Sequence, residues 1–415
     1  MKFGLWVPRV VMASVLVVAV LAAGRAVAQV GDLQADLLLR SYIEDKRVKA
    51  EPVRQPWNQS VQLNLSQPWQ VTDELQLFAE TSLFGAVTLH DPANIGELAH
   101  LGRGREDHDL AYPGRYGLRV QAPDWGLNWG LQDISLPFMV AKDNLWLPPT
   151  WHGITGYRQL NDELRVEGGQ LSRARLRGRE QLDPLLSAYG FVPIDSLRYA
   201  GLSWQYQPQG KLQLYVNQAT NLWQQLYLTA DQATTDQAGR TWQLGAAFYT
   251  TTADGSARQG PQDGDAGSLT AGLNWHGVNL SVSVQRIWSD QVLDYLLDAY
   301  GPGLAIVMVS DYNAPQEFAQ QIKLDIADTV LGVTGLQLSL WALAGQSAAP
   351  ALRSPQGEDR RHYETGFALL YRFGYGLFNG GDLMLTAINH RANGPYPDPT
   401  QRAMRLVLNW PVNLF

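Results

Sequence analysis

Apolar and polar residues alternate along most of the chain. In the segment 33–44, Leu37 and Leu39 fall on one face, whereas Arg40 and Glu44 fall on the other. The same alternation recurs in the segments 61–66, 75–80, 212–217, 269–276, 278–285, 321–326 and 404–410. A period of two is typical of β-strands, because successive side chains point to opposite faces. No long segment shows the competing helical period, so the pattern predicts an all-β protein.

The length of this pattern favours a single transmembrane β-barrel over a soluble sandwich. The polar faces are rich in Gln, Asn, Ser and Thr, and no linker divides the chain into domains. A barrel with an apolar, lipid-facing side and a water-filled lumen explains both faces. Long connections are expected at 91–114, 252–267, 289–316, 347–361 and 392–401, and short turns lie between them.

The direction of the strands sets their number. The segments 211–220 and 240–251 must both run outward, so a returning strand is needed between them. The segment 222–230 supplies it, although Gln224 would then face lipid. The count becomes 18, an even number that leaves both ends on the periplasmic side, and 16 is the alternative.

The first 28 residues have the form of a secretory signal peptide. Lys2 and Arg9 precede an apolar run from Val10 to Ala23, and Ala26-Val27-Ala28 forms a small-residue cleavage site. The run is shorter than the roughly 20 residues of a spanning helix, which argues against a membrane anchor. We therefore expect residues 1–28 to be removed and residues 29–415 to form the barrel.

Composition narrows the function classes. Only 17% of the residues are charged, against about 25% in soluble domains, as expected when half of each strand faces lipid. Cysteine is absent, which excludes disulfides, thiolate metal sites and cysteine nucleophiles. The net charge is −7, and it becomes −10 once Lys2, Arg9 and Arg25 are removed with the signal peptide. That balance argues against nucleic acid as a partner.

Several motifs, in their order and spacing, resemble one family. The stretch Lys142-Asp143-Asn144, followed by Leu147 to Gly153, is similar to the third-loop region of the OprD family of substrate-specific porins from the outer membrane of Gram-negative bacteria. The segments 164–170, 199–202 and 222–228 resemble further family strands, and the likeness extends over nearly the whole mature chain. It implies an 18-stranded barrel, monomeric or in loose trimers, with inward-folded loops that narrow the pore.

The resemblance also implies a row of lumen-facing basic residues that guides small carboxylate-bearing solutes, such as amino acids or aromatic acids. We name the candidates of this chain the basic ladder: Arg40, Arg119, Lys142, His152, Arg165, Arg173, Lys323, Arg372 and Arg405. Arg40 and Arg405 match the first and last strands, whereas Leu145 and His152 replace arginines of the family pattern. Lys142 is a partial substitute. The structural alternative is an ion-paired, solvated lumen wall.

The sequence thus predicts an outer-membrane channel for anionic or zwitterionic small molecules. No cofactor, metal or reaction is expected. The seven histidines show no spacing typical of a Ser-His-Asn hydrolase on a barrel wall. A receptor or adhesin barrel is the main alternative, and a barrel hydrolase is a weaker one. Outer-membrane lipid and lipopolysaccharide are the expected surroundings, and the arginine cluster beginning at Arg173 is either a lumen track or a lipopolysaccharide contact.

Overall fold

The structure is a computed structural model that describes residues 32–91, 109–301, 304, 310–349, 357–393 and 399–413. The predicted signal peptide at 1–28 lies outside the described residues. Within them, the only helix is α2 (Asp328–Leu331), four residues in a connection between two strands. No described helix has the length and hydropathy needed to cross a bilayer.

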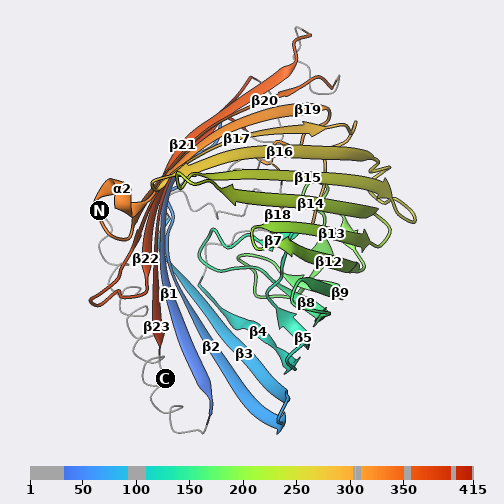
Figure 1. Cartoon of the computed structure of the whole chain (residues 1–415), viewed down its shortest axis with the longest axis vertical. Helices are drawn as coiled ribbons and strands as arrows, with labels where there is room; N and C mark the ends of the chain where they lie inside the picture. The colour runs from blue at the N-terminus through green and yellow to red at the C-terminus, as the bar shows by residue number, and fades with distance from the viewer. Residues whose placement is uncertain are drawn as a thin grey trace.

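Eighteen of the described strands form a closed antiparallel barrel (Figure 1). The first strand, β1 (Gln34–Val48), pairs with β2 (Trp57–Thr72) on one side and with the last strand, β23 (Gln401–Asn413), on the other. The other wall strands are β3 (Leu75–His90), β4 (Leu110–Gln121), β5 (Trp125–Gln132), β8 (Thr150–Gln159), β9 (Leu164–Arg175), β12 (Leu197–Gln207), β13 (Gly210–Ala219), β14 (Trp223–Thr235), β15 (Thr241–Ala253), β16 (Gly264–Trp275), β17 (Val278–Ile287), β19 (Glu317–Ile326), β20 (Leu336–Ser347), β21 (Arg360–Arg372) and β22 (Asp382–Ala392). The prediction of 18 strands rather than 16 is confirmed.

The expected returning strand exists as β14, and its register explains the polar residue on its outer face. Gln224 is exposed and lies at the end of β14 that adjoins the long connection after β15. Its amide donates to Asp254 over 2.9 Å, and Asp254 also accepts from Gln218. Gln224 therefore belongs to a polar cluster at the rim of the barrel, beyond the apolar band of the wall.

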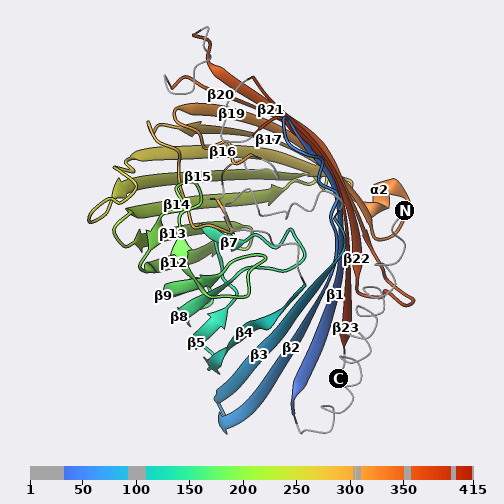
Figure 2. The ribbon, with the colours of Figure 1, turned by 180° about the vertical axis from the view of Figure 1, so that it is seen from behind.

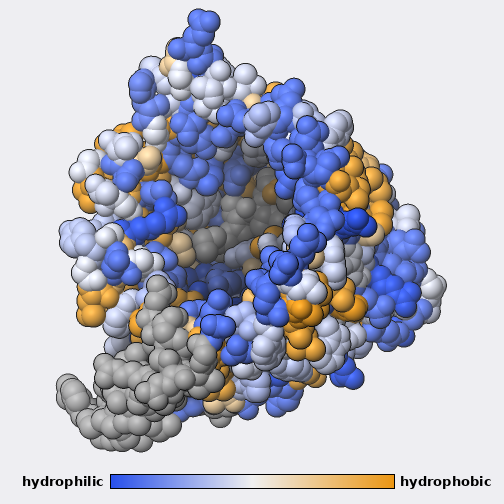
Figure 3. Space-filling model, turned by 60° about the horizontal axis from the view of Figure 1, so that its bottom comes forward, coloured by the Kyte–Doolittle hydropathy of each residue, from blue (hydrophilic) through white to orange (hydrophobic). Residues whose placement is uncertain are grey.

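The two faces of the wall differ as the alternation predicts. On β17, Val282 is 49% exposed on the outer face, whereas its neighbour Ser283 is 6% exposed on the inner face. Such an arrangement satisfies all backbone groups in the sheet and leaves apolar side chains for lipid. Figure 3 shows a hollow in the molecule bordered by hydrophilic residues, with hydrophobic residues on the outer flank.

Tryptophans occupy two environments. Trp69, Trp125 and Trp275 are 46%, 38% and 51% exposed near strand ends, which suits an aromatic girdle at the membrane interface. Trp146 and Trp151 are buried at 5% and 0% and pack inside the barrel. The sequence could not separate these groups, because the inner ones belong to an infolded loop and the strand that follows it.

Candidate functional site: the constriction of the lumen

The connection between β5 and β8, residues 133–149, folds into the barrel (Figure 2). It forms two short strands, β6 (Ser135–Leu136) and β7 (Met139–Ala141), which pair with each other. Its apolar segment Leu145-Trp146-Leu147 is buried against the inner wall. The wall residues of this cluster are Tyr42, Phe84, Ala86, Leu110, Tyr112 and Val407. The loop therefore carries its own apolar anchor, which holds it inside an otherwise polar lumen.

Arg40 fixes the same loop to β1. Its guanidinium donates to both carboxylate oxygens of Asp143, at 2.5 and 3.1 Å, and to the Leu145 carbonyl at 2.8 Å. A further bond of 2.7 Å reaches Asn409 on β23. The side chain is only 6% exposed, so its donors point at the loop rather than into open water. The predicted lumen orientation of Arg40 agrees with the structure, but the residue acts as a tether.

Two further loops complete the constriction. The connection between β17 and β19 contributes β18 (Ala299–Tyr300), which pairs with β7. The connection between β9 and β12 contributes β10 (Asp183–Leu186) and β11 (Pro193–Ile194), and Ser187 forms a bridge to Leu296. An ion pair of 3.1 Å joins Arg177 to Asp298, which is fully buried. The inward-folded loops that the family resemblance implied are thus found, and they include described residues of the connection between β17 and β19.

Asp294 lies on the connection between β17 and β19 and is the hub that joins it to the connection between β9 and β12. Its carboxylate accepts from the backbone N–H groups of Ala188 and Tyr189, at 2.9 and 3.0 Å, and from the side chain of Gln259 at 2.7 Å. Burial raises the pKa of Asp294 above its usual range, and these donors oppose that rise. A single carboxylate thereby fixes the relative position of two constriction loops.

Four basic residues of the inner wall are ion-paired with adjacent carboxylates. Arg405 lies 2.8 Å from Glu44, and the two residues are directly opposite each other on β23 and β1. Three more ladder residues are ion-paired: Arg119 with Glu80 at 2.8 Å, Arg165 with Glu167 at 3.2 Å, and Lys323 with Asp325 at 3.0 Å. A wall of neutral pairs produces a weaker field than a row of bare cations. The structural alternative, an ion-paired lumen wall, describes these positions.

Lys142 differs from this group. It lies on the infolded loop, and its backbone N–H donates to the Asp298 carbonyl at 2.9 Å. Its ammonium donates to the Tyr295 hydroxyl at 3.2 Å and lies 5.3 and 5.8 Å from the ring centroids of Tyr295 and Tyr300. No described carboxylate lies within ion-pair distance of Lys142. Two tyrosine rings stabilise a cation without cancelling its charge, so this ammonium remains able to bind an anion.

Two ladder residues face outward, contrary to the prediction. His152 lies beside Trp129, which is 52% exposed on the outer face, with 6.2 Å between the ring centroids. Arg173 is exposed and pairs directly with His152 across β8 and β9. For Arg173 the cause is a bulge: Arg173 pairs with His152 but Leu171 with Gly153, so Ser172 is an extra residue on β9 that reverses the phase. Arg372 keeps its predicted inner phase but is exposed at the end of β21.

Sequence reasoning missed a buried chain of polar side chains on the inner wall. Glu317 on β19 lies 2.5 Å from Nε2 of His362 on β21, whose Nδ1 lies 3.0 Å from Nε2 of His390 on β22. His390 donates through Nδ1 to the Pro399 carbonyl at 2.9 Å. The alternation of β21 and β22 signalled their inward direction, but their contact depends on the register between strands far apart in sequence.

Comparison with known proteins agrees with this architecture. The chain matches the family described as outer membrane porin, OprD family, over residues 30–414. It is 22% identical to Porin D of Pseudomonas aeruginosa over 351 residues, which cover 78% of this chain and 77% of that protein.

Solved structures show the same fold. OccD3 (OpdP) of Pseudomonas aeruginosa superposes with a TM-score of 0.82 at 21% identity, covering 93% of this chain and 92% of the other. OccK2 (OpdF) of the same species, in complex with glucuronate, gives a TM-score of 0.81 at 17% identity, covering 92% and 99%. OpdK with vanillate gives 0.82 at 17% identity, covering 92% and 98%. Because the family match extends over almost the entire chain, the protein belongs to the OprD family of outer membrane porins.

Proposed function

We propose that this porin passes small polar solutes that carry a carboxylate, either anionic or zwitterionic, and that Lys142 is the residue that contacts the carboxylate in the constriction. The observation that carries the proposal is the unneutralised ammonium of Lys142, held between two tyrosines on the loop that narrows the lumen. A cation at a narrow point concentrates anions, and a single flexible contact also lets them leave. The glucuronate and vanillate bound by related porins are carboxylates of this size.

The paired wall supports a role for the other ladder residues. Arg165 and Glu167 border a cavity of about 580 Å³ between the infolded loop and the wall, together with Lys211 and Tyr215. Adjacent positive and negative groups suit the two ends of a zwitterion better than a net anion, because each end finds an opposite charge. We infer that Arg119, Arg165, Lys323 and Arg405 guide solutes through such pairs, and that His152 and Arg173 take no part.

We also propose that passage involves no chemical change of the solute. The arrangement most similar to a catalytic one is the Glu317–His362–His390 chain, and each of these side chains is 0% exposed. A solute in the lumen has no access to them. Among the described residues, no group of three or more His, Asp or Glu side chains is placed to hold a metal ion.

Liposome swelling tests the proposal. The full-length porin is reconstituted, and the rate of glucuronate entry is compared with that of glucose, a neutral solute of similar size. Lys142→Gln is expected to lower the glucuronate-to-glucose ratio by about threefold to tenfold, because one charge-assisted contact is lost. Lys323→Gln is the matched control: it removes the same charge from one of several ion pairs on the wall, so a smaller fall in the ratio is expected. An unchanged ratio in Lys142→Gln, or an equal fall in both variants, would refute a specific role for Lys142.

A further inference from the structure

An apolar groove crosses the outer face of the barrel over five strands. Its border nearest the loops is a row of five residues, each paired with the next across neighbouring strands. They are Leu228, Phe248, Gly267, Arg286 and Phe318, on β14, β15, β16, β17 and β19. Small side chains form its floor, including Ala230 and Ala246 in the next row. The groove has a volume of about 430 Å³. It faces lipid rather than the lumen, because Leu228, Phe248 and Phe318 are 37–40% exposed on the outer side.

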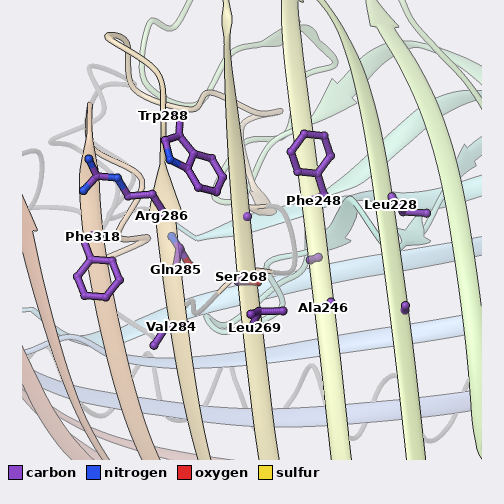
Figure 4. A pocket seen from close by; sticks show the side chains of 13 residues that line it. Leu228, Ala246, Phe248, Ser268, Leu269, Val284, Gln285, Arg286, Trp288 and Phe318 are labelled. Atoms are coloured by element: carbon purple, nitrogen blue, oxygen red, sulfur yellow. The ribbon is translucent and has the colours of Figure 1, made fainter.

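Gly267 deepens the groove at its centre. A Cβ at this position would lie 3.2 Å from the ring of Trp288, so the indole rests over the strand where a side chain would otherwise stand. Trp288 is itself 56% exposed. Figure 4 shows Trp288 leaning toward β16 and Arg286 extending toward β19, on the loop side of Phe318. The two side chains thus border the groove at the end nearest the loops.

Arg286 is the unusual member of this row. It points outward from β17, two residues from Val284 and Trp288 on the same face. Among the described residues, Arg286 makes no hydrogen bond and no ion pair. This includes Asp265, which faces the same side of β16, two positions before Gly267. An unpaired cation on a lipid-facing strand is costly away from the interface, and the cost disappears when an anion meets it there.

The height of Arg286 on the wall places it at the external interface. Val278 begins β17 at the short-turn side, and the long connection 288–316 follows its other end. Eight residues at roughly 3.3 Å each, in a strand tilted by about 40°, raise Arg286 on the order of 20 Å above Val278. The apolar band of such barrels is about 25 Å tall, which leaves about 5 Å above the Arg286 backbone. A long arginine side chain can extend over that distance, so its guanidinium can reach the outer-leaflet headgroups.

We propose that this groove binds a phosphorylated lipid of the outer leaflet, lipid A of lipopolysaccharide. Its acyl chain lies in the apolar groove below the row, and a phosphate on its headgroup meets Arg286. An apolar groove with one cation at the headgroup level selects a ligand that is both a lipid and an anion. A second copy of the chain or a peptide does not supply that combination on this face. Arginine suits this contact because its planar donors bind phosphate oxygens in pairs.

The test measures lipid bound to the intact, detergent-solubilised barrel by native mass spectrometry. The probes are bisphosphorylated lipid A and the same lipid after phosphatase treatment. Arg286→Gln is expected to weaken binding of the bisphosphorylated form by about tenfold or more, because a charge-assisted contact is lost, and to leave the dephosphorylated form unchanged. Ala246→Leu fills the groove and is expected to weaken both forms.

Two matched variants control for general effects. Arg361→Gln removes another exposed arginine near the external end of a strand, β21, outside the groove. Ala271→Leu enlarges another outward-facing alanine on β16 that does not line the groove. Neither is expected to change lipid binding. Equal losses of lipid binding in Arg286→Gln and Arg361→Gln would overturn the site. It would also be overturned if Arg286→Gln left lipid binding unchanged, or if that variant changed only the oligomeric state. Solute passage is independent of this outcome, because the groove lies outside the lumen.

Discussion

Replacing Arg40 by alanine is expected to loosen the constriction without removing it. The change deletes the paired bonds to Asp143 and the bond to the Leu145 carbonyl. Hydrogen bonds that involve a charged partner contribute about 1.5–3 kcal/mol. Asp143 is 44% exposed and regains water when its partner is lost, so we take a net loss of about 2–3 kcal/mol for the docked loop. At about 1.4 kcal/mol per factor of ten, undocked states become roughly 30- to 150-fold more frequent.

The apolar anchor of the loop limits this effect. Leu145, Trp146 and Leu147 are 0–5% exposed and remain buried in the variant. Burial of a large apolar side chain contributes about 1.5–3 kcal/mol, so the three together exceed the lost polar contribution. The docked state therefore stays the major one, and the expected change is an increase in brief openings rather than a permanently wide pore.

Single-channel recording in planar bilayers measures this prediction. Arg40→Ala should show frequent short steps to a higher conductance, whereas the main conductance level stays close to that of the unaltered porin. Arg405→Ala is the matched control: it also deletes a lumen arginine from an ion pair, but that pair, with Glu44, joins two strands of the wall. Identical traces from the two variants would refute the tether, because they would show that only the lost charge matters.

Other substitutions test the remaining parts of the structure. Asp294→Ala removes the acceptor shared by two constriction loops, so limited proteolysis should cleave both loops faster, and an unchanged pattern would contradict its role as a hub. Glu317→Gln breaks the buried pair with His362 and should lower the free energy of unfolding by about 1–3 kcal/mol in urea titrations; equal stability would mean that the pair contributes nothing. A Cβ at Gly201 would lie 2.0 Å from the Tyr215 ring, so Gly201→Ala should cost about 1–3 kcal/mol, whereas Gly374→Ala, which meets no atom within 4 Å, should leave the unfolding midpoint unchanged.

The sequence alone determined the barrel and the direction of most of its side chains. A period of two is a local property, because neighbouring residues on a strand point to opposite faces whatever their partners are. For that reason the inner phase of Arg40 and Arg405 and the existence of β14 followed from the pattern. The number of strands followed from the direction in which each strand crosses the membrane, since a chain that crosses outward must return before it crosses outward again.

The tertiary structure decided what those side chains do. Arg40 meets Asp143, 103 positions away, and Arg405 meets Glu44, 361 positions away, so the neutral character of the ladder depends on closure of the barrel and infolding of a loop. The extra residue at Ser172 reversed the direction of Arg173, and alternation cannot reveal a bulge that only the pairing register defines. The row that places Arg286 beside Gly267 and Phe318 likewise comes from three strands in register. Local backbone geometry fixes where a side chain points, but its partners are set by contacts that no short stretch of sequence contains.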